Sequence, residues 1–291
     1  MPRDGLLRQS TELIVRKERY DRMTSRSLLL WSVASVITLA SAVYQRVTGP
    51  TYPLRASVTI GSETFTFRLI RSQENPRDAE ISVPVPNRGI SGYYEFRRQL
   101  SDDPWDRRPL ARRGESLIGW IPSQPAASKV QYRIFLEKPG AAPVPVTPEP
   151  VVLRFKDYVP RIPVLWPHIA LMFVGMLCSN RAGLEALVRG TQTNRLSLWA
   201  FIPMVAGGII LGPMVQKFAF GSYWTGWPFG HDMTDNKTAV AVLFWLIAVW
   251  RLQKRPEARG WAIAAAVVTL LVFAIPHSVW GSEIAYGQVP K

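Results

Sequence analysis

The sequence lacks the residue patterns that mark the best-known enzyme classes. It contains no G-x-S-x-G nucleophile elbow, no H-E-x-x-H pair, no phosphate-binding glycine loop and no C-x-x-C pair, each of which sets reactive groups at the spacing their chemistry needs. Cysteine is nearly absent, since Cys178 is the one example in the chain. An exported part would therefore hold no disulfide and would depend on its own hydrophobic core. These absences favour a protein that is not an enzyme.

Charged residues are missing from five apolar runs. No Asp, Glu, Lys or Arg lies inside these runs and no internal repeat relates them, which leads away from pumps and transporters, because those proteins place ionisable groups near the bilayer midplane. Four runs have roughly the 20 residues needed to cross a hydrocarbon core, and the shortest reaches that length only if residues at its ends contribute. The sequence predicts five transmembrane helices, in the runs 27–45, 162–180, 196–216, 238–250 and 260–282.

Acidic residues are scarce: 21 Asp and Glu stand against 35 Lys and Arg, a formal net charge of +14. In a soluble chain this balance would indicate nucleic acid. Here many basic residues lie in three short segments, before the first run, between the second and third, and between the fourth and fifth. The order of the helices puts these segments on one side, and an excess of Lys and Arg marks the cytoplasmic side. We expect a bacterial inner-membrane protein with a cytoplasmic N-terminus and a periplasmic C-terminus, surrounded by the lipid bilayer and not bound to nucleic acid.

Between residues 46 and 161 the pattern changes from apolar blocks to alternation. Phe65, Phe67 and Leu69 alternate with Thr66 and Arg68, for example. A period of two predicts half-buried strands, and about seven such strands between Pro, Gly and Asn turns are typical of an immunoglobulin-like sandwich. The expected fold class is an α-helical membrane protein with an inserted all-β periplasmic domain. The expected parts are a cytoplasmic basic segment 1–26, a first transmembrane helix 27–45, the β-sandwich 46–161 and a four-helix membrane domain 162–291.

Two stretches are suited to partner binding. The outer loop 217–237 combines glycines, carboxylates and tryptophans, and tryptophan prefers an apolar body with a wet edge, so we expect a structured cap at the outer membrane surface. The stretch 102–113 of the β-domain is basic and interrupted by proline. It can bind an acidic patch of a partner or lipid phosphates, or it can be a solvated loop between strands. The predicted partner-binding residues are Trp224, Trp227, Phe229, Trp105, Arg107 and Arg108.

The three histidines all fall near the outer membrane boundary in this topology. Imidazole binds zinc, copper and iron, and two axial histidines suit a haem. Structural histidines that bond headgroups or backbone carbonyls are a second interpretation, and a proton or quinone-related role is a third. The nearby carboxylates have a similar alternative, because Asp235 or Thr234 can cap the fourth helix and Lys237 can pair with an acid. The candidate cofactor ligands are His168 and His277, and the candidate metal ligands are His231, Asp232, Asp235 and Glu283.

Four stretches of the C-terminal half together resemble a family of bacterial polytopic membrane proteins whose activity is not established. The resemblance implies a polytopic membrane fold and brings no activity with it. In that family the position of His231 often holds an aromatic residue, which favours His168 and His277 as a pair. The stretches are Pro167-His168-Ile169 with Met172-Phe173, Arg181-Ala182-Gly183-Leu184-Glu185, residues 224–238, and Pro276-His277-Ser278 with Gly281-Ser282-Glu283.

Two functional hypotheses follow from the sequence. The first is a non-enzymatic accessory or scaffolding subunit of a larger membrane complex, such as a respiratory or photosynthetic assembly. It would dock other membrane-protein subunits through its periplasmic β-domain and its aromatic outer loop. The alternative is a membrane protein that binds a metal, a haem or a quinone headgroup through His168 and His277 at the periplasmic boundary.

Overall fold

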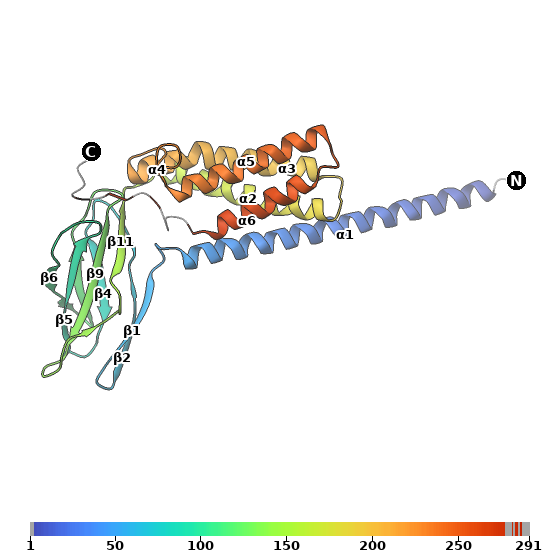
Figure 1. The fold of residues 1–291 in the computed structure, drawn as a ribbon. Coiled ribbons are helices and arrows are strands. Elements are labelled where there is room, and N and C mark those ends of the chain that lie inside the picture. Colours follow the sequence, from blue (N-terminus) through green and yellow to red (C-terminus); the bar gives the residue numbers. More distant parts are fainter. Residues whose placement is uncertain (1–2, 277–280, 282, 285, 287–291) are drawn as a thin grey trace. The chain divides into compact units, whose positions relative to one another are not determined.

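A computed structural model describes residues 3–276, 281, 283, 284 and 286. The chain forms two compact units, which we call the helical unit and the β unit (Figure 1). The helical unit contains residues 1–44, 169–208 and 239–274, and the β unit contains residues 45–168, 209–238 and 275–291. The helical segments are α1 (Arg3–Thr48), the π-helical η1 (Arg161–Leu165), α2 (Trp166–Leu187), α3 (Thr193–Met204), the π-helical η2 (Val205–Leu211), α4 (Gly212–Phe220), α5 (Met233–Lys254) and α6 (Gly260–Ala274).

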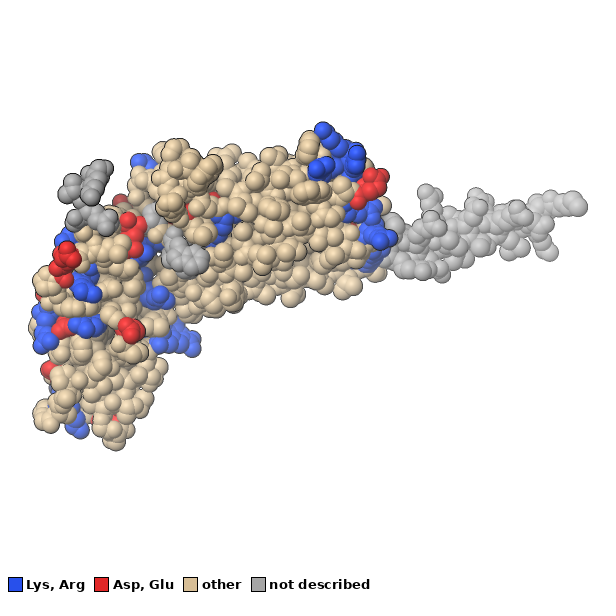
Figure 2. Space-filling view, viewed as in Figure 1, with Lys and Arg blue, Asp and Glu red and all other residues tan. Residues whose placement is uncertain are grey.

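In the described part of the chain, three helical stretches are long and apolar enough to cross a membrane. They are Thr24–Thr48, Arg161–Leu187 and Thr193–Phe220. The second is η1 continued by α2, and the third is α3 continued by η2 and α4. Figure 2 shows helix surface with few charged side chains and a group of Lys and Arg at its end. These features are compatible with a membrane protein.

The sequence predicted five such helices, and among the described residues the last two runs do not meet the same criterion. Residues 260–274 of the run 260–282 form α6, which ends at Ala274, two residues before Pro276. Its 15 residues rise about 22 Å, less than a hydrocarbon core of roughly 30 Å. The run 238–250 lies inside α5, whose first turns carry Asp235 and Lys237 and whose last turn carries Arg251 and Lys254. Charges at both ends therefore leave a short apolar stretch.

Helices α2, α3, α5 and α6 of the helical unit share one core built largely from small residues. A Cβ on Gly183 of α2 would lie 2.6 Å from the Cβ of Ala266, so glycine is what lets α2 and α6 approach. On another side of α2, Asn180 donates a hydrogen bond of 2.9 Å from Nδ2 to Thr38 Oγ1 of α1. The shared core consists of Cys178, Ala182, Ala186, Leu196, Ala200, Met204, Trp245, Ala248, Leu252, Ala262, Ala265 and Ala266.

The second apolar stretch runs beyond the predicted run and takes in a buried ion pair. Arg181 Nη1 lies 2.7 Å from Glu185 Oε2, one turn further along α2. The other carboxylate oxygen of Glu185 accepts a 3.1 Å hydrogen bond from the Gln192 amide, so the pair also fixes the start of α3. Gly190 leaves room for this carboxylate, since a Cβ there would come within 2.0 Å of Oε1.

The strands of the β unit form three sheets within the described residues. The largest has the order β3-β11-β9-β5-β6 with β10 added to β9, the second has the order β4-β8-β7, and β1 pairs with β2. The strands are β1 (Leu54–Ile60), β2 (Glu63–Leu69), β3 (Ser72–Glu74), β4 (Ala79–Pro84), β5 (Ser91–Arg98), β6 (Asp106–Pro109), β7 (Ala111–Arg113), β8 (Ser116–Ile121), β9 (Lys129–Glu137), β10 (Val144–Pro145) and β11 (Val151–Lys156).

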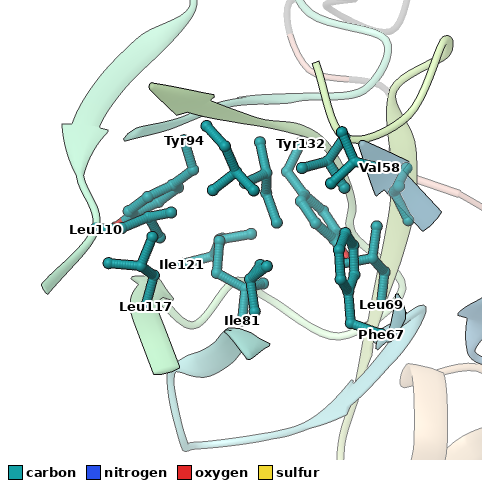
Figure 3. Close-up of a cluster of buried hydrophobic side chains, with 14 of the residues drawn as sticks. Val58, Phe67, Leu69, Ile81, Tyr94, Leu110, Leu117, Ile121 and Tyr132 are labelled. Carbon is teal, nitrogen blue, oxygen red and sulfur yellow. The ribbon is translucent and has the colours of Figure 1, made fainter. Parts of the chain in front are cut away.

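The three sheets enclose one hydrophobic core (Figure 3). Alternation along β2 and β9 buries every second residue, as the sequence predicted. Figure 3 shows Phe67 and Leu69 of β2 on the same side as Val58 of β1, with Ile81, Tyr94, Ile121 and Tyr132 also lining the core. The large buried side chains of all three sheets therefore pack together in one core. This packing fixes the positions of the strands, and so of the side chains on their outer faces.

The β unit differs from the predicted all-β sandwich in two respects. The described chain has eleven strands where about seven were expected, and β3 pairs with β11 in parallel. Helical segments also belong to the same unit. The Asp157 amide, just after β11, donates a 3.0 Å hydrogen bond to the carbonyl of Ala219 in α4. Val159 and Val164 share a second hydrophobic cluster with Ala219, which explains why α4 and η1 join the strands.

We predict that Gly119→Ala destabilises the β unit by about 1–3 kcal/mol, the cost of overpacking a filled core. A Cβ on Gly119 would lie 2.5 Å from the Tyr94 ring, and that ring is held by a 2.7 Å hydrogen bond from its hydroxyl to the Trp120 carbonyl. Urea-dependent proteolysis of the full-length protein in detergent measures the loss. Trp120→Phe, one residue along β8 on the outer face, is the control and should unfold at the wild-type urea concentration. Equal midpoints for all three proteins would contradict the packing described.

Candidate functional site

The aromatic stretch between α4 and α5, residues 221–232, is ordered by its own contacts, and we call it the cap loop. It begins at Gly221, whose φ of 86° lies in the left-handed region that glycine adopts without strain. The Gly221 amide bonds the Lys217 carbonyl at 2.9 Å, and Lys217 Nζ bonds the Gly221 carbonyl at 2.7 Å. These two bonds end α4 and turn the chain into the loop.

Side chains from the first turn of α5 bind three successive amides of the cap loop. Asp235 Oδ2 accepts hydrogen bonds from the Thr225 amide at 2.7 Å and from the Gly226 amide at 3.0 Å. Asn236 Oδ1 accepts one from the Trp227 amide at 2.7 Å. Because Asp235 is buried, the Thr225 and Gly226 amides depend on its carboxylate as their acceptor. We call this arrangement the amide clamp.

Asp232 caps α5. Its Oδ1 accepts a 2.8 Å hydrogen bond from the Thr234 amide, the second residue of the helix, in the manner of an N-cap side chain. The sequence had indicated Thr234 or Asp235 for this position, and Asp235 is instead occupied by the clamp. Two of the candidate metal ligands thus have structural partners, and both lie near Thr225 Oγ1, at 3.3 Å for Asp232 and 3.5 Å for Asp235.

A buried arginine links the sheet to the loop region. Arg154 lies in β11, and its guanidinium carbon stands 4.4 Å from the centre of the Phe220 ring. Burial lowers the pKa of Arg154, while the nearby charges of Asp232 and Glu283 act to raise it. Lys237, also buried, donates a hydrogen bond to the Ile275 carbonyl. Positive and negative groups are therefore interleaved where β11, the cap loop and the chain after α6 meet.

The described residues after α6 contact the ends of β5 and β9. Glu283 Oε2 lies 2.6 Å from Lys129 Nζ, and both side chains are largely buried. Tyr286 donates a 3.1 Å hydrogen bond from its amide to the Leu100 carbonyl, its hydroxyl contacts Ser128 Oγ, and the guanidinium of Arg98 lies 4.3 Å from its ring centre. Glu283, proposed from the sequence as a metal ligand, is thus one half of an ion pair.

Two of the three histidines, His168 and His231, lie within the described residues. His168 is half-buried near the start of α2, and His231 is exposed in the cap loop. His277 lies outside the described residues. Nowhere in the described chain do three or more His, Cys, Asp or Glu side chains gather in a group that could hold a metal ion. The metal, haem or quinone hypothesis for His168 and His277 stays a prediction.

A second set of side chains lies on the outer face of the largest sheet. In β5, Tyr94 points into the core, so Tyr93, Glu95 and Arg97 share the opposite face. The strand register sets Glu95 directly between Arg107 of β6 and Arg133 of β9. It also sets Tyr93 beside Phe135, whose rings stack with centres 4.9 Å apart.

Arginine and aromatic side chains alternate along this face, and we call them the arginine–aromatic ladder. Arg107 lies 4.3 Å from the centre of the Tyr93 ring. Arg133 lies 3.9 Å from the Trp105 ring, and Arg97 covers the same ring at 4.5 Å. The ladder consists of Arg97, Trp105, Arg133, Phe135, Tyr93 and Arg107, with the buried carboxylate of Glu95 at its centre.

The predicted partner-binding residues of the β-domain separate in the structure. Trp105 and Arg107 belong to the ladder, whereas Arg108 alternates to the other face of β6, where it bonds Asp106 at 2.8 Å and lies 5.0 Å from the Phe96 ring. Of the predicted loop aromatics, Trp224 donates a 3.1 Å hydrogen bond to the Trp227 carbonyl, while the Trp227 and Phe229 side chains are exposed.

Sequence reasoning missed Glu95, Arg97 and Arg133, because which side chains meet depends on the pairing of β5 with β9. It also missed Arg154. The one available signal was a charged residue between Leu153 and Phe155, in a run that is otherwise apolar.

Comparisons with known proteins give no match from which a function of the site could be inferred. No protein-family model, no curated protein and no solved structure matches this chain. The family resemblance of the C-terminal half stays a prediction.

We predict that Asp235→Ala opens the cap loop. Removing the carboxylate leaves the Thr225 and Gly226 amides without their acceptor, which costs about 1–3 kcal/mol and should speed their exchange roughly tenfold or more. Hydrogen–deuterium exchange of residues 221–232 in the full-length protein measures the effect. Asp102→Ala, which removes an exposed carboxylate of the β unit, should leave this exchange unchanged. Wild-type exchange in Asp235→Ala would show that the clamp does not hold the loop.

Proposed function

We propose that this chain is a membrane-anchored accessory subunit that docks an acidic partner protein through the arginine–aromatic ladder. The ladder is the observation that carries the proposal. It is a fixed row of arginines on the outer face of a sheet, supported by aromatic rings and supplied with one buried carboxylate.

The anchoring part of the proposal extends to α5 and α6. Both contribute to the same core as α2 and α3, through residues such as Trp245 and Ala266, so they belong to one bundle. Their outer surfaces carry exposed apolar side chains, including Leu243 and Leu271, which suit contact with lipid. In this proposal five helices lie in a bacterial inner membrane, although two of them have shorter apolar stretches.

The topology follows from the basic residues of the connections. Arg189 and Arg195 lie between or near the ends of α2 and α3, and Arg251 and Lys254 end α5. An excess of such residues places these connections in the cytoplasm and residues 46–161 in the periplasm. The immunoglobulin-like character of that region is part of the proposal, supported by strands of two larger sheets that share one core.

The charge and the geometry of the ladder favour the binding of anionic groups. Glu95 pairs with Arg107 at 2.7 Å and with Arg133 at 2.6 Å. The charge of Glu137 also acts on Arg107. Two carboxylates therefore stand against the three arginines Arg97, Arg107 and Arg133, and one positive charge is left over. Stacking on rings fixes the planes of the guanidinium groups before a partner arrives, which reduces the side-chain entropy lost on binding. The Arg107 side chain is 63% exposed and is available for contact.

An acidic protein surface fits this row better than an isolated anion. Arg107 and Arg133 lie on strands separated by β5, so their backbones are about 10 Å apart across the sheet. That spacing suits several carboxylates carried by one partner, each able to accept two parallel hydrogen bonds from a guanidinium. Arginine and aromatic side chains are also the residues that contribute most at protein interfaces.

The proposal is tested by photo-crosslinking in cells. A photoreactive amino acid replaces the exposed Asp102, three residues before Trp105 of the ladder, in the full-length protein, and the adduct is identified by mass spectrometry. We expect one protein partner with an acidic surface. Because an interface arginine of this kind contributes about 2 kcal/mol, Arg97→Gln with Arg107→Gln should lower the yield at least roughly tenfold. Raised salt should lower it as well.

Arg88→Gln is the matched control, because it removes an exposed arginine of the same unit outside the ladder. It should keep the wild-type yield. An adduct that is unaffected by the ladder variants, an adduct with lipid alone, or no adduct would each count against docking through the ladder.

A further inference from the structure

We propose that the tip of the cap loop, Trp227 and Phe229, inserts into the interfacial layer of the lipid bilayer and anchors the β unit there. The inference rests on the proposed membrane anchoring and goes beyond it, because it assigns these two side chains to lipid and not to the protein partner. The occupant of the tip is the boundary between lipid headgroups and acyl chains.

The two side chains are exposed although they are large and aromatic. Trp227 is 76% exposed and Phe229 is 83% exposed. Leaving this much apolar surface in water is unfavourable, and in a soluble setting such residues would turn inward. Exposure of both on one short loop therefore indicates a second surface that covers them.

The cap loop is held too firmly to cover its own tip. The amide clamp fixes the Thr225, Gly226 and Trp227 amides, and the Phe229 and Gly230 amides both bond the Gly226 carbonyl at 2.9 Å. Gly230 must be glycine in this turn, since a Cβ there would lie 2.3 Å from the Thr225 carbonyl oxygen. The tip is thus presented outward by a turn whose amides at 227, 229 and 230 are already bonded within the protein, which lowers the cost of contact with lipid.

The cap loop that carries the tip follows the end of one apolar stretch, which packs against the start of another. The cap loop starts one residue after Phe220, where the stretch Thr193–Phe220 ends, and η1 opens the stretch Arg161–Leu187. α4 and η1 pack together through Ala219, Val159 and Val164. Both stretches therefore meet the membrane boundary within the same packed part of the β unit.

Other exposed apolar residues gather at this same boundary. Ile162 is 82% exposed at the start of one stretch, and Trp166 is exposed one turn later. Tyr223 is exposed at the base of the cap loop, with Lys217 Nζ 5.4 Å from its ring centre. Tryptophan and tyrosine at the ends of apolar helices, with a nearby lysine able to reach headgroups, are the composition of a membrane interface. A protein partner would not require the aromatics to follow the helix ends in this way.

Spin labels test the depth of the tip. Cys178 is the single cysteine and is buried, so Cys178→Ser gives a background in which one new cysteine at a time can carry a nitroxide. The full-length protein is reconstituted in vesicles of phosphatidylcholine and phosphatidylglycerol. Collision with oxygen, which concentrates in lipid, is compared with collision with a water-soluble nickel chelate. Labels are placed by Phe229→Cys and, as a second variant, by Trp227→Cys.

Two controls bracket the measurement. Ser62→Cys labels the exposed turn between β1 and β2 and should report water, and Val36→Cys labels an exposed position in the middle of Thr24–Thr48 and should report the hydrocarbon core. We expect the labels at 227 and 229 to lie about 5–10 Å below the headgroups, with oxygen collision well above the Ser62 value and nickel collision well below it.

The outcomes separate this inference from the proposed membrane anchoring. Nickel collision at 227 and 229 equal to that at Ser62 would place the tip in water and overturn the inference. Low collision with both reagents would mean that protein covers the tip, and would overturn it equally. If the label at Val36 also reported water, the membrane anchoring would fail; if Val36 reported lipid and the tip did not, only the inference would fail.

Discussion

A buried backbone amide has no water to bond, and the cap loop depends on acceptors that meet this constraint for its Thr225 and Gly226 amides. The carboxylate of Asp235 meets it by accepting two successive amides, and Asn236 takes the third. Because both come from the first turn of α5, the loop is tied to a helix and not to another loop. The positions of the exposed aromatics and the contacts of Asp232 follow from this attachment.

Much of the fold could be predicted from sequence periodicity, and the failures have identifiable causes. Alternation gave β2 and β9 correctly, because one face of each strand is buried in the core. Hydropathy alone could not place the end of α6, because the uncharged run continues in the sequence beyond Ala274. The parallel pair β3 and β11 joins segments about 80 residues apart, and no local pattern records such a pairing. The union of α4 with the strands depends on Asp157 and Ala219 in the same way.

In the candidate site, too, the sequence indicates some of the residues, while their contacts depend on how the strands pair. Trp105 and Arg107 could be selected because they stand in a short basic stretch, yet Arg108 could not be told apart from them until the alternation of β6 was known. Glu95 looks like an ordinary strand residue in the sequence. Its role comes from the register that sets it between two arginines. The acidic residues before α5 were recognised as cap or pairing groups, but which one serves as cap is decided by atomic contacts.

The β unit is assembled from three separated stretches of chain, and this arrangement imposes an order on its biogenesis. The strands leave the ribosome after α1 and before α2 to α6, and domains generally begin to fold as they are made. The ion pair of Lys129 with Glu283 spans 154 residues, however, and cannot form until α6 has been synthesised. Until then, Lys129 at the start of β9 lacks its partner Glu283. Formation of the complete β unit would thus indicate that helices α2 to α6 have already been synthesised.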